Sequence, residues 1–80
     1  MKTFLDAAGT RWTATVSEED TPRHHGRWYL VFEAEDGSSA LPMGEVRWQT
    51  RASAERTIRT MSDAELVRRL ASLVDRTASG

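Results

Sequence analysis

The sequence predicts a single α+β domain: a small antiparallel four-stranded sheet, then two C-terminal helices packed on one of its faces. The first observation is a change in hydrophobic period near Gln49, from every second residue to the spacing of a helix face. The second is that all six aromatic residues lie at or before Trp48. We therefore expect an aromatic sheet face under an aliphatic helix layer, in the order ββββαα, with the sheet at about 2–49 and the helices at about 53–76.

The first two strands form a hairpin. A short strand begins near Phe4, and residues 6–9 read Asp-Ala-Ala-Gly. This tetrapeptide suits a type I turn, because Asp favours the first position and Gly accepts a positive φ at the fourth. The return strand covers residues 10–17, and its inward side chains are predicted to be Trp12, Ala14 and Val16.

The third strand, at residues 27–34, follows an exposed polar loop at 17–26 that carries Pro and Gly. Both of its faces are partly apolar: Tyr29 and Val31 lie on one, and Trp28, Leu30 and Phe32 on the other. We therefore expect a central strand that is covered on both sides.

A second turn is predicted at residues 35–38, because Asp-Gly is a strong turn signal. The fourth strand is irregular, since the parity of its apolar residues changes after Gly44. A β-bulge there would reset the register. Pro42 lacks an N–H donor and indicates an edge or interrupted strand.

The first helix is predicted over Ser53 to Thr60, with Ala54, Ile58 and Met61 on its inner face. Ser62 is the expected N-cap of the second helix, and Glu65 three residues later completes a capping box. The core-facing residues of the second helix are predicted to be Leu66, Val67, Leu70, Leu73 and Val74.

Composition narrows the function classes. Eighty residues supply one core and little scaffold for a deep cavity, so an enzyme with a small-molecule substrate is not expected. Cysteine is absent, and neither a signal peptide nor a membrane-spanning run is apparent, so we expect a cytoplasmic protein without membrane insertion. The bias toward Arg over Lys is typical of a GC-rich bacterial genome. Residues 1–45 carry a net charge of −4 and residues 46–80 one of +3.

Motifs that carry chemistry are missing. There is no cysteine nucleophile, nucleophile elbow, P-loop or zinc-protease motif, and no motif of a known family is recognisable. The adjacent His24 and His25 lack the spaced partners of a zinc site, so we expect neither a metal nor a cofactor. The alternative role for these two histidines is contact with a partner.

The sequence therefore favours a protein–protein interaction module, such as an accessory or adaptor subunit of a larger bacterial assembly. Trp12 and Trp28 have inward parity and are expected in the core. Trp48 follows the predicted bulge, so it is the tryptophan least committed to the core. Tryptophan beside arginine is typical of an interface anchor. The predicted partner-binding residues are Trp48, Arg51, Tyr29, Arg47, His24 and His25.

The alternative function is a small nucleic-acid-binding module that uses the arginine-rich C-terminal half. Its predicted contact residues are Arg56, Arg59, Arg69 and Arg76. Acidic residues are interspersed among these arginines, so a solvated helix face remains the simplest interpretation. The two functions differ in salt dependence, because each phosphate that a protein neutralises releases counterions.

Overall fold

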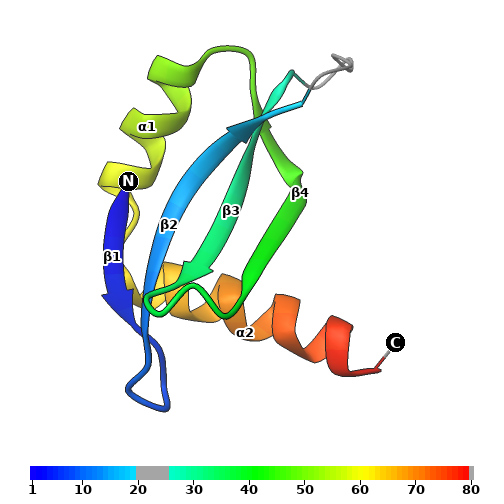
Figure 1. The fold of residues 1–80 in the computed structure, drawn as a ribbon. Coiled ribbons are helices and arrows are strands. Elements are labelled where there is room, and N and C mark those ends of the chain that lie inside the picture. Colours follow the sequence, from blue (N-terminus) through cyan, green and yellow to red (C-terminus); the bar gives the residue numbers. More distant parts are fainter. Residues whose placement is uncertain (20–25, 80) are drawn as a thin grey trace.

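The computed structural model describes residues 1–19 and 26–79, with side chains as far as Asp75. Four strands are followed by two helices (Figure 1), which confirms the predicted ββββαα order. The elements are β1 (Lys2–Leu5), β2 (Arg11–Glu18), β3 (Trp28–Ala34), β4 (Ala40–Trp48), α1 (Arg51–Thr60) and α2 (Asp63–Ser79). Within these residues, no helix is long and apolar enough to cross a membrane.

The four strands form one antiparallel sheet in the order β1-β2-β3-β4. Every connection between strands therefore joins neighbouring strands of the sheet. β4 lies at an edge of the sheet, as Pro42 predicted, because a proline cannot donate to a further strand.

The core lies between one face of the sheet and the two helices, as the distribution of aromatic residues predicted. Phe4 and Phe32 meet edge to face, with ring centroids 5.8 Å apart. Ile58 and Leu66 cover them from the helices and are fully buried. Such close packing of aromatic and aliphatic side chains is the main source of stability in a chain this small.

The first hairpin turn is organised by one carboxylate. The Asp6 carbonyl accepts the Gly9 N–H at 3.0 Å, and Gly9 has a φ of +85°. Asp6 Oδ1 accepts the N–H groups of Ala8 and Thr10, and Oδ2 accepts the indole N–H of Trp12, each at 2.9 Å. The predicted type I turn with its glycine is confirmed, and its aspartate also holds a core tryptophan in position.

The predicted bulge in β4 is confirmed as a register shift. Tyr29 pairs with Arg47, whereas the next residue, Leu30, pairs with Met43. Residues 44–46 therefore bulge out of the ladder between β3 and β4. Because of this insertion, odd-numbered residues before the bulge and even-numbered residues after it point to the same face of the sheet.

Both helix starts are capped by side chains. The Thr50 hydroxyl accepts the Ser53 N–H at 3.1 Å, so α1 begins at Arg51, two residues earlier than predicted. The Ser62 hydroxyl accepts the Glu65 N–H at 3.1 Å, which confirms the N-cap of α2. The Glu65 carboxylate bonds to an arginine one turn later rather than completing the capping box.

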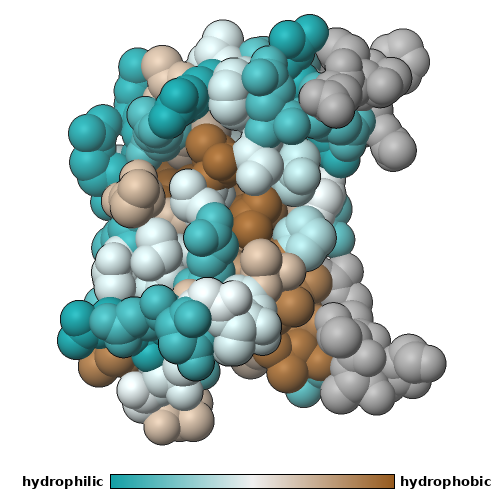
Figure 2. Space-filling model, viewed as in Figure 1, coloured by the Kyte–Doolittle hydropathy of each residue, from teal (hydrophilic) through white to brown (hydrophobic). Residues whose placement is uncertain are grey.

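Two expectations about burial are wrong. The sheet is covered by helices on one face only, and in Figure 1 the strands lie in front of α2. On the other face, Val31 is nevertheless buried, with 6% exposure, and it lies between Thr15 of β2 and Pro42 of β4. Figure 2 shows apolar groups bounded by polar ones on the side that faces the viewer. Val74, predicted in the core, is 42% exposed, because α2 continues past the part of the sheet that it covers.

Candidate interaction site

Two tryptophans face each other across strands at one end of the sheet. Trp28 begins β3 and pairs with Trp48, which ends β4. Both are half-buried, and Trp48 packs against the core, so the expectation that Trp48 is the tryptophan least committed to the core is wrong. Trp28 does not belong to the core cluster, so its predicted core role is wrong. The reason is its position at the strand end, beyond the part of the sheet that the helices cover fully.

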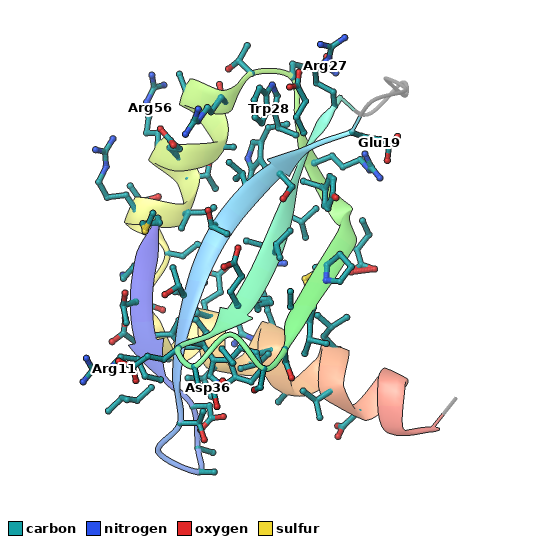
Figure 3. All side chains as sticks on the ribbon, viewed as in Figure 1. Arg11, Glu19, Arg27, Trp28, Asp36 and Arg56 are labelled. Atoms are coloured by element: carbon teal, nitrogen blue, oxygen red, sulfur yellow. The ribbon has the colours of Figure 1, made fainter. Side chains whose placement is uncertain are left out.

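Arg51 lies against this pair. It is the first residue of α1, and its guanidinium carbon is 6.0 Å from the centre of the Trp28 ring. Figure 3 shows Trp28 between the start of α1 and the ends of the strands. A cation at this distance from an indole is attracted by the ring quadrupole. We call Trp28, Trp48 and Arg51 the tryptophan corner.

The bulge and a glycine bring the corner together. Because residues 44–46 reset the parity of β4, Trp48 lies on the same sheet face as Trp28. Gly26 has a φ of +103°, and a Cβ there would lie 2.2 Å from the carbonyl oxygen of Trp48. The chain can therefore approach the end of β4 this closely only with a glycine.

Tyr29 and Arg47 lie at the same end of the sheet but on its opposite face. Their parity is opposite to that of the tryptophans, and the Arg47 guanidinium carbon is 5.4 Å from the centre of the Tyr29 ring. The structure thus separates the predicted partner-binding residues into two groups, one on each face.

Arg47 ties together backbone segments that are distant in the sequence. Its guanidinium donates to the Gly44 carbonyl at 2.6 Å, to the Gly26 carbonyl at 3.3 Å and to Glu19 at 2.9 Å. Its side chain is only 12% exposed. This geometry braces the bulge against the start of β3 and leaves little of the guanidinium for a partner.

Each arginine around the corner has a carboxylate neighbour. Arg27 bonds to Glu18 at 2.9 Å, and Arg51 bonds to Glu55 at 3.2 Å. These pairs are exposed, so each contributes little to stability. Among the described residues, their effect is to balance the arginine charges at this end of the molecule.

The arginines of the nucleic-acid alternative do not form one surface. Arg56 and Arg59 are exposed on α1, and neither makes an ion pair with the described residues; Figure 3 shows Arg56 projecting away from the sheet. Arg69 bonds to Glu65 at 3.0 Å. The side chain of Arg76 lies outside the described part of the chain.

The histidine prediction concerns residues that the structure does not describe, since His24 and His25 fall within 20–25. Among the residues that it does describe, no three histidine, cysteine or acidic side chains are grouped as metal ligands.

Sequence reasoning did not select Trp28 for the site, because its inward parity indicated the core. The available signal was that Trp28 is the first apolar residue after a long polar loop. No protein-family model matches the chain, and neither does a curated protein or a solved structure. Function must therefore be argued from the site itself.

Proposed function

We propose that this chain is a small protein–protein interaction module that binds its partner through the tryptophan corner. It would act in the bacterial cytoplasm as an accessory or adaptor subunit of a larger assembly. The observation that carries the proposal is the cross-strand pair of half-buried tryptophans with Arg51 against Trp28.

Residue type and rigidity support this role. Tryptophan and arginine are the residues most enriched among the few that dominate binding energy at interfaces. The backbone that carries the rings is fixed by strand pairing and by the close approach of Gly26, and Trp48 also packs against the core, so the corner is largely formed before a partner arrives. Side chains ordered in advance lose less conformational entropy on binding.

The charges at the corner favour a protein over a nucleic acid. Arg27 and Arg51 are each matched by a carboxylate within 3.2 Å. Phosphate binding requires cationic groups in excess, whereas a hydrophobic anchor with a balanced polar rim is typical of a protein interface.

The first experiment is capture of partners from the organism's own lysate with the tagged chain, with and without nuclease. A captured protein that survives nuclease is then titrated against variants. Trp28→Ala should weaken its binding by about 2 kcal/mol, and Arg51→Ala by about 1 kcal/mol or more. Trp28 is a cleaner probe than Trp48, because Trp48 packs against the core.

Arg11→Ala is the matched control for Arg51→Ala. Arg11 is also exposed and paired with a carboxylate, at 3.9 Å from Glu35, but it lies at the other end of β2 from the corner. Its replacement should leave binding unchanged. A folded Trp28→Ala variant that binds with the wild-type affinity would exclude the corner as the anchor.

The nucleic-acid alternative rests on the exposed and unpaired Arg56 and Arg59 within the described residues. It requires that capture is lost after nuclease treatment. It also requires that affinity falls steeply with salt and is reduced by Arg56→Ala with Arg59→Ala.

A further inference from the structure

α2 carries an apolar seam that the sheet leaves largely uncovered. Val67, Ala71 and Val74 follow one another at the four- and three-residue spacing of a heptad repeat. Leu66 and Leu70, one residue before two of them, are buried in the core, with 0% and 2% exposure. In contrast, Ala71 is exposed and Val74 is 42% exposed. Val67 is half-buried and packs against the core. α2 thus has two adjacent apolar faces, and the fold of one chain covers the second only at Val67.

The seam borders a groove of about 240 Å³ between α2 and the first hairpin turn. The turn lines the groove with Asp6 and two small residues, Ala7 and Ala8. A small residue in the middle of a helix face, here Ala71, lets a second helix approach closely. The shape of the seam therefore suits another helix better than a large isolated side chain.

Two opposite charges flank the seam on the same side. Arg68 and Asp75 are seven residues apart, each directly after a seam valine, so they occupy the same heptad position. Neither makes an ion pair within the part of the chain that the structure describes. When two identical helices pack antiparallel, the same flank of each faces the other. Arg68 would then face Asp75 of the second copy, and symmetry would repeat the pair.

Other arrangements are less favourable for these charges. A parallel pair of α2 helices would put Asp75 beside Leu70, which is already in the core of its own chain. If one helix of the antiparallel pair slid by one heptad so that the N-terminal halves overlapped, Arg68 would lie next to Arg68 of the second chain. These like charges would repel each other. The charges thus favour one orientation and one register.

We propose that two copies of this chain associate through antiparallel packing of their α2 seams, with Ala71 opposite Val74 and Arg68 opposite Asp75. Because the seam is only a few helical turns long, the interface is at the low end of interface sizes, and the dimer is reversible. Figure 1 shows α2 at the end of the sheet away from the start of β3, where Trp28 lies, so this dimer leaves the tryptophan corner free.

Sedimentation equilibrium of the full chain over a concentration series, up to about 1 mM, tests the proposal. The wild type should show a reversible monomer–dimer equilibrium. Arg68→Asp and Asp75→Arg should each weaken it about tenfold, since each change acts twice in a symmetric dimer. The combined swap, Arg68→Asp with Asp75→Arg, should restore the affinity to within about threefold.

Arg56→Asp is the matched control, because it makes the same charge change at an exposed arginine on α1. It should leave the equilibrium unchanged, and circular dichroism should show all variants folded. The proposal is overturned if the wild type stays monomeric over the whole concentration series. It is also overturned if a dimer forms and neither single charge reversal changes its dissociation constant. If each single change weakens the dimer but the combined swap does not restore its affinity, the antiparallel register is wrong.

Discussion

Replacement of Gly26 tests how the end of the sheet is assembled. Gly26 lies two residues before the start of β3, is buried, and has a φ of +103°. A Cβ built there would lie 2.2 Å from the carbonyl oxygen and 2.5 Å from the carbonyl carbon of Trp48. The obstacle is backbone, so no side-chain rotation can relieve the overlap.

We expect Gly26→Ala to lower the free energy of unfolding by about 2–5 kcal/mol. About 1–2 kcal/mol comes from holding a residue with a Cβ at positive φ. About 1–3 kcal/mol comes from the overpacking that pushes β3 and β4 apart. This sum is a large share of the stability of a typical small domain, about 5–15 kcal/mol.

Gly37→Ala is the matched control. Gly37 also has a positive φ, +76°, but a Cβ there has nothing within 4 Å. It should therefore show the conformational cost alone, about 1–2 kcal/mol. Urea unfolding followed by tryptophan fluorescence measures both variants, provided that the slope of the transition stays constant. Equal losses in the two variants would refute the argument that close approach to Trp48 requires a glycine.

Three further predictions concern the cap, the first turn and the histidines. Ser62→Ala should lower the free energy of unfolding by about 0.5–2 kcal/mol through loss of the N-cap, and an unchanged denaturation midpoint would contradict it. Hydrogen bonds from the Thr10 N–H and then the Trp12 indole lower the pKa of Asp6, so its contribution is present above its ordinary pKa and is lost as pH falls through the lowered value. Asp6→Asn should accordingly flatten the acid limb of a plot of unfolding midpoint against pH, and an unaltered limb would count against the turn network. His24→Ala with His25→Ala should leave folding and metal content unchanged; stoichiometric zinc or nickel retained after dialysis by the wild type alone would show otherwise.

Most of the fold could be predicted because its signals are local. The turn at Asp6 depends on one carboxylate within hydrogen-bond reach of N–H groups two and four residues later. The start of α2 depends on the Ser62 hydroxyl and a backbone N–H three residues on. Such interactions join residues that are close in sequence, and therefore a pattern of residue types is enough to indicate them.

The candidate site was predicted in part. The sequence grouped Trp48 with Arg51, whereas the structure puts Arg51 against Trp28, the cross-strand partner of Trp48. It did not show that Tyr29 lies on the other sheet face from Trp48, because that depends on how β4 pairs after the bulge. It also did not show that Arg47 is held by Glu19, whose position depends on where β2 ends.

By itself, then, the sequence determined the order of the elements, their turns and caps, and which face of each one is apolar. Only the tertiary structure decided how far each apolar face is covered. Trp28 and Val74 have the correct periodicity for the core, yet both remain partly exposed, because each lies beyond the region where sheet and helices overlap. Periodicity reports the direction of a side chain, whereas burial depends on the lengths and crossing of the packed layers.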